Sequence, residues 1–160
     1  MSYPLIRAQA AAILGAVSGI GVVHEYQRMA ATWEKFLDLF KDSNNKINGC
    51  VITRTSRVNR QITLGQKEIA HIMALRFYMG LNDADETETT FQALVDAAVD
   101  TFQDNDYETL NDTCLTTHPD WGPMNGAVGL QADIIDTRMF GSVLCHFAEC
   151  KLCALELIDD

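Results

Sequence analysis

A run of glycines near the start of the chain has the residue types and spacing best suited to binding a small molecule. Residues 15–21 (GAVSGIG) have the glycine spacing of a dinucleotide-binding loop. Such a loop follows a strand and opens a helix, so that a pyrophosphate meets a helix N-terminus. Here the preceding residues are alanine-rich with a helical pattern, and no Tyr-x-x-x-Lys pair is present. We therefore expect a helix end and a turn. A small nucleotide-binding protein acting through Gly15–Gly21 is the alternative.

The cysteines offer a second possible chemistry. Cys150 and Cys153 form a C-x-x-C pair, with Cys145 and His146 nearby. Zinc needs four converging ligands, and in a strand, side chains three positions apart point to opposite faces. The chain has five cysteines, Cys114 among them, and no second C-x-x-C. We expect buried, reduced thiols without a metal or cofactor, and a zinc protein as the alternative.

Catalytic patterns are missing from the rest of the chain. The four histidines are scattered, and no Gly-x-Ser-x-Gly elbow occurs. Asp96, Asp100 and Asp104 follow i, i+4, i+8 spacing, which indicates one acidic stripe along a helix, without an EF-hand loop. Trp121 lies in a Pro/Gly-rich loop and is either a contact anchor or a pin to its own core. We expect no enzymatic activity.

The charge is strongly acidic and unevenly distributed. The 160 residues include 22 acidic and 12 basic ones, for a net charge of −10, which argues against general binding of nucleic acid. No Lys or Arg occurs between Arg76 and Arg138, and ten of the twelve basic residues lie at or before Arg76. The acidic stretch is either a solvated face or one of two complementary docking surfaces. The apolar run at 10–23 is too short to span a membrane, so we expect no association with a membrane.

Three helices and four strands are predicted to position these residues. Helices are expected at 3–17, where Leu5, Ala8, Ala12, Ile13 and Ala16 have helical spacing, at 32–41 and at 85–104. Strands are expected at 49–55 and 69–79, paired antiparallel across a polar arm or loop at 54–66. Two more are expected at 127–137 and 141–157, the last with a bulge or break. Residues 105–126 read as a loop.

The pattern predicts one α+β domain over residues 1–160. Its mainly antiparallel or mixed four-stranded sheet is packed by two to three helices, and a long polar hairpin arm extends from it.

Several segments, in order along the chain, resemble the tail terminator (tail completion) proteins of tailed bacteriophages. They are residues 19–28 (GIGVVHEYQR), Trp33 and Phe36, 47–54 (INGCVITR), 76–78 (RFY), 87–91 (TETTF) and 143–146 (VLCH). The resemblance implies a virion structural protein of the tail or neck, assembled in the host cytoplasm. It also implies a hexameric ring that caps the tail tube and contacts the tube protein and the head connector, with DNA passing through its hole without sequence-specific binding. Another neck or minor tail protein is the alternative.

Charge separation suggests where such subunits would meet. A ring needs head-to-tail contacts, and an acidic wall does not hold passing phosphates. We expect the interface with other subunits or the tail to include a basic set and an acidic helix, together with Trp121. The basic set is Arg54, Arg57, Arg60 and Lys67; the acidic positions are Asp96, Asp100 and Asp104.

Overall fold

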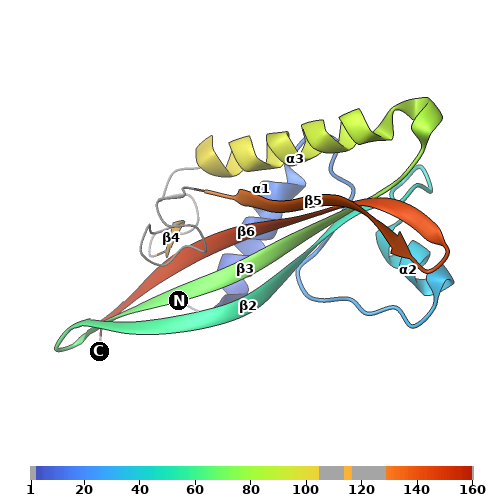
Figure 1. Ribbon diagram of the computed structural model, residues 1–160. Coiled ribbons are helices and arrows are strands. Elements are labelled where there is room, and N and C mark those ends of the chain that lie inside the picture. The colour runs from blue at the N-terminus through green and yellow to red at the C-terminus, as the bar shows by residue number, and fades with distance from the viewer. Residues whose placement is uncertain (1–2, 105–113, 117–128, 160) are drawn as a thin grey trace.

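The computed structural model describes residues 3–104, 114–116 and 129–159 (Figure 1). The fold is α+β, as predicted, with a mixed sheet. Within the described residues the sheet contains six strands, so the predicted number of four is wrong. The elements in chain order are α1 (Tyr3–Gly15), β1 (Val22–His24), α2 (Trp33–Phe40), β2 (Asn48–Thr63), β3 (Gln66–Gly80), the 3-10 turn η1 (Asp83–Asp85), α3 (Thr87–Asp104), β4 (Cys114–Thr116), β5 (Gln131–Phe140) and β6 (Val143–Asp159).

Strand order in the sheet is β1-β2-β3-β6-β4, and β5 pairs with β6 beside β4. Among the strand pairs that the structure describes, β1–β2 is parallel and the others are antiparallel. The two strands missing from the prediction, β1 and β4, have three residues each, too short for an alternating pattern to reveal them. No helix in the described part of the chain is long and apolar enough to cross a membrane.

The predicted antiparallel hairpin forms, but the segment at 54–66 is not a separate arm or loop. β2 runs on to Thr63, and Gly65 takes a left-handed φ of 96° in the turn before Gln66. β6 stays paired with β3 out to this turn, where Gln66 faces Asp159. The hairpin end in Figure 1 is therefore the narrow end of a three-stranded ladder. The break expected in the last strand is also absent; the register shift lies in β5, between Ala132 and Ile134.

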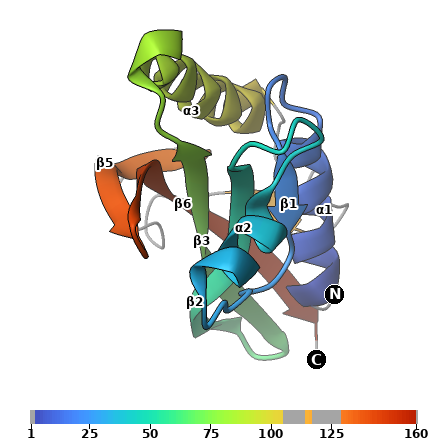
Figure 2. The same ribbon diagram turned by 90° about the vertical axis from the view of Figure 1, so that its right-hand side faces the viewer.

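Helices α1 and α3 cover one face of the sheet and build the main core with it (Figure 2). The predicted stripe of α3, Phe91 to Phe102, is buried as expected. Helix α1 forms where predicted, but the side of the helix that faces the core is not the predicted one. It buries Ile6, Ala10, Ile13 and Leu14, whereas Leu5 is exposed. Because α1 is rich in alanine, two stripes have helical spacing, and the bulkier one faces the core.

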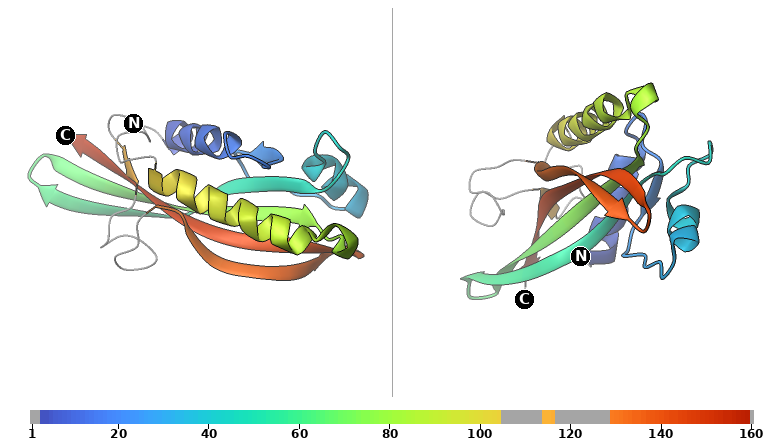
Figure 3. Two further views of the ribbon diagram at one scale, coloured as in Figure 1. Left: turned by 90° about the horizontal axis from the view of Figure 1, so that it is seen from above. Right: turned by 45° about the vertical axis from the view of Figure 1, so that its right-hand side comes forward.

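The opposite face of the sheet carries α2 over a second, aromatic cluster. Phe36 lies 4.7 Å from Phe40 and 5.3 Å from Phe140 between ring centroids, and Tyr78 of β3 contacts all three rings. The helix begins after Thr32, whose hydroxyl accepts a hydrogen bond from the backbone N–H of Lys35. Figure 3, seen from above on the left and from an oblique angle on the right, shows the long strands extending beyond the helices at the hairpin end.

Candidate assembly surfaces

The glycine run has the reverse of the context that a dinucleotide loop requires. Helix α1 precedes it and strand β1 follows it, so no helix N-terminus opens after Gly21. A Cβ added at Gly21 would lie 1.9 Å from the carbonyl oxygen of Asn48. The Asn48 amide also donates to the carbonyl of Gly19, at 2.9 Å. Gly21 therefore allows the chain to approach β2 closely. The predicted helix end and turn are present, because α1 ends at Gly15 and a turn follows it.

The four cysteines whose side chains the structure describes are buried, as predicted. Cys150 packs into the main core and Cys153 into a cluster on the opposite sheet face. Cys50, Cys145, Cys150 and Cys153 are buried free thiols, and the side chain of Cys114 lies outside the described residues. Burial raises the pKa of Cys145 to about 11 and that of Cys150 to about 12. In the described part of the chain, no three His, Cys, Asp or Glu side chains meet in a way that could hold a metal ion.

A buried polar pair lies on the α1 face of the ladder. His71 Nε2 lies 2.9 Å from a carboxylate oxygen of Glu156, and both side chains are buried. Burial by itself raises the pKa of Glu156, but hydrogen bonds and positive charge, including those of His71, lower it below its ordinary value. The Tyr3 ring stacks beside His71, with 5.7 Å between centroids. The pair joins β3 to β6, and α1 contacts it through the Tyr3 ring.

Of the predicted basic residues, Arg54 contacts other side chains of its own chain. Its guanidinium lies 4.3 Å from the centroid of the Tyr3 ring and 3.4 Å from His71 Nδ1. A register shift between Arg54 and Ser56 brings Arg57 opposite His71, on the same face as Arg54. Arg57 is exposed.

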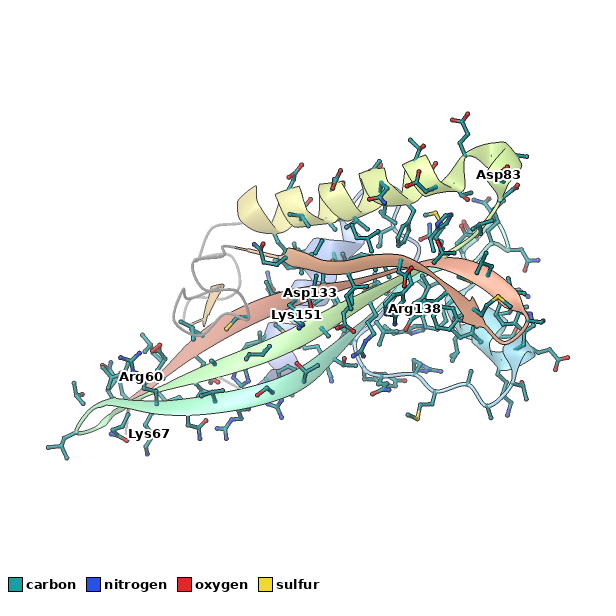
Figure 4. All side chains as sticks on the ribbon, in the orientation of Figure 1. Arg60, Lys67, Asp83, Asp133, Arg138 and Lys151 are labelled. Carbon is teal, nitrogen blue, oxygen red and sulfur yellow. The ribbon has the colours of Figure 1, made fainter. Side chains whose placement is uncertain are left out.

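Arg60 and Lys67 lie near the hairpin end (Figure 4), and both also have partners within the chain. The predicted acidic residues Asp96 and Asp100 are exposed on the outer side of α3. The side chain of Asp104 and all of Trp121 lie outside the described residues. Because the predicted contacts join separate subunits, their pairing stays a prediction.

Two exposed apolar surfaces were not predicted from the sequence. The first is the hairpin tip, which we define as Ile62, Leu64 and Leu157; the relative exposure of Leu64 is 105%. The second is β5, which has a strand partner on one side only among the described residues and exposes Ile134, Ile135 and Met139. Adjacent Ile134 and Ile135 were the available signal, because neighbours in a strand point to opposite faces and so cannot share one core.

A hollow at the other end of the molecule lies among three acidic side chains. It has a volume of about 180 Å³, and its lining is Leu81, Asp83, Glu86, Thr87, Glu88, Thr137 and His146. We call it the acidic hollow. The Thr87 hydroxyl lies 3.0 Å from His146 Nε2, and burial lowers the pKa of His146. Asp85, beside it, has a cation partner in Lys46 at 3.8 Å.

The sequence matches no model of a known protein family, and a search of curated proteins finds no match.

Proposed function

We propose that this chain is a structural protein of a bacteriophage virion, the tail terminator subunit. It forms a ring that caps the tail tube and joins it to the head connector. The observation that carries the proposal is the placement of charge: Arg60 and Lys67 lie at the hairpin end and Asp83 at the opposite end of a long molecule (Figure 4). The kind of assembly comes from the resemblance in residues 19–28, Trp33 and Phe36, 47–54, 76–78, 87–91 and 143–146.

Opposite charges on different surfaces favour contacts between unlike patches of identical copies. Such heterologous contacts close into a ring when the rotation between neighbours allows it. Complementary patches also steer encounter and suppress wrong pairings. Within this proposal, Arg57, Arg60 and Lys67 meet a neighbouring copy, while Arg54 mainly holds α1 to β2.

The net charge of −10 suits a wall past which DNA moves. Lys and Arg bind phosphates by displacing counterions, and an acidic surface lacks that driving force. Asp96 and Asp100 are exposed in a row along α3, free to face either a lumen or a neighbour. No sequence-specific DNA contact is required.

The test is the oligomeric state of the purified chain, alone and with tail tubes of the phage that encodes it. Native mass spectrometry should give a closed ring, with six copies expected, and negative-stain images should place it at one end of each tube. Rings that bind along the tube or elsewhere in the neck would favour another neck or minor tail protein. A strictly monomeric chain at high concentration, with and without tubes, would refute the proposal.

A further inference from the structure

The hairpin tip exposes more apolar surface than an isolated subunit needs. Leu64 is fully exposed in the turn, and Ile62 of β2 and Leu157 of β6, opposite Glu68 near the same end of the ladder, are each 44% exposed. A single exposed leucine is ordinary on a protein surface, but a cluster at the end of a rigid ladder is typical of a contact site. The ladder is rigid because β2, β3 and β6 remain paired out to Thr63, Gln66 and Asp159.

Positive charge borders this tip. Arg60 is exposed and Lys67 is half-buried, whereas Asp159 is the exposed acidic side chain described there. Glu68 and Glu156, nearby in the ladder, are buried. A partner for the tip should therefore combine an apolar recess with a negatively charged rim.

The acidic hollow has both properties. Leu81 lines it and is 40% exposed, while Asp83, Glu86 and Glu88 around it are exposed carboxylates. A cavity of about 150 Å³ is enough to hold benzene, so a hollow of about 180 Å³ has room for a leucine side chain. The hollow lies beside Thr137 of β5 and the first turn of α3, far along the sheet from the hairpin turn (Figure 4).

We propose that the hairpin tip of one copy inserts Leu64 into the acidic hollow of a second copy. Arg60 and Lys67 then face Asp83, Glu86 and Glu88 of that copy. This inference rests on the proposed ring and specifies the contact within it. It replaces the α3 stripe, Asp96 and Asp100, as the surface that receives the hairpin. The tip and the hollow lie at opposite ends of one chain, so the contact repeats from copy to copy.

Cysteine pairs test the geometry directly. A chain with Leu64→Cys and Thr137→Cys should form disulfide-linked multimers under mild oxidation, with residues 64 and 137 joined in peptide maps. The matched control, Leu64→Cys with Asp96→Cys, should stay unlinked. Links at residue 96 in place of 137, or links from residue 64 to the tube protein, would overturn the inference.

A charge substitution tests the contribution of the tip. Leu64→Glu should weaken association between copies tenfold or more, because it would place a carboxylate in an acidic recess. Leu5→Glu makes the same change at an exposed residue of α1 and should leave association unchanged. Circular dichroism checks that both variants fold.

The outcomes separate this inference from the function. Wild-type rings together with unimpaired assembly of Leu64→Glu would overturn the docking site and leave the ring intact. A wild-type chain that stays monomeric with and without tail tubes would overturn the proposed function, and the docking site with it.

Discussion

Replacing Gly21 by alanine should destabilise the protein for a reason that the structure makes specific. A Cβ at this position would lie 1.9 Å from the carbonyl oxygen and 2.6 Å from the carbonyl carbon of Asn48. Both are backbone atoms of the central β2, so neither can rotate away. The chain entering β1 must move off β2, which weakens the parallel pairing of Val22 with Gly49.

The magnitude follows from the kind of clash. Overpacking that forces a backbone shift costs about 1–3 kcal/mol, and a clash with backbone atoms belongs at the upper end. Gly15→Ala is the matched control, because Gly15 ends α1 and a Cβ there would meet nothing within 4 Å. Alanine is the better helix former, so this change should stabilise the protein by roughly 0.5–1 kcal/mol.

Urea and thermal unfolding, followed by circular dichroism at one protein concentration, would measure both variants. For a chain of this length each kcal/mol shifts Tm by about 2–4 °C. We therefore expect roughly a 6–12 °C fall for Gly21→Ala and a small rise for Gly15→Ala. If the free energy of unfolding of Gly21→Ala is within about 1 kcal/mol of the wild-type value, the close approach to Asn48 does not constrain the fold.

Three further results are expected. The pKa of Glu156 is lower in the folded protein than its ordinary value of 4.5. The stability that Glu156 contributes is therefore fully present above pH 4.5 and is lost as the pH falls through the folded-state pKa. Glu156→Gln should therefore cost roughly 1–3 kcal/mol at pH 7 and flatten the loss of stability in acid; an unchanged acid titration would contradict this. Peptide-resolved alkylation at pH 8 should leave Cys145 and Cys150 unmodified until urea is added, since their raised pKa values keep them protonated; rapid labelling of the native protein would count against this. Millimolar nicotinamide dinucleotide should leave Tm unchanged, and a rise would reopen the nucleotide alternative.

The most predictable elements were those in which apolar residues recur with a clear period and leave only one face that can be buried. Phe91, Leu94, Val95, Ala98 and Phe102 leave α3 a single stripe to bury, and the structure buries it. In β3 the alternation from His71 to Met79 also fixed which side chains share a face. The opposite orientation of Cys150 and Cys153 followed from the same two-residue period.

Other features depended on contacts between distant segments. Two stripes of α1 could have faced the sheet, and the stripe with the bulkier side chains Ile6 and Leu14 packs into the core. The contacts of Arg54 with the Tyr3 ring and with His71 could not be read from its charge, which predicted only a place at an interface. Strand β1 has three residues, and only its place beside β2 makes it a strand.

The sequence by itself determined the α+β class, the three helices, the central hairpin and the uneven charge. Each of these depends on local periodicity or on composition, which need no knowledge of neighbours in space. The tertiary structure alone decided that the hairpin ends in an exposed Leu64 and that Asp83, Glu86 and Glu88 surround a hollow at the far end. The physical reason is that exposure and recesses arise where separate segments meet or fail to meet. Thr137 and His146 lie more than fifty residues from Leu81 in the chain, and only folding of the sheet beneath α3 brings them to one site.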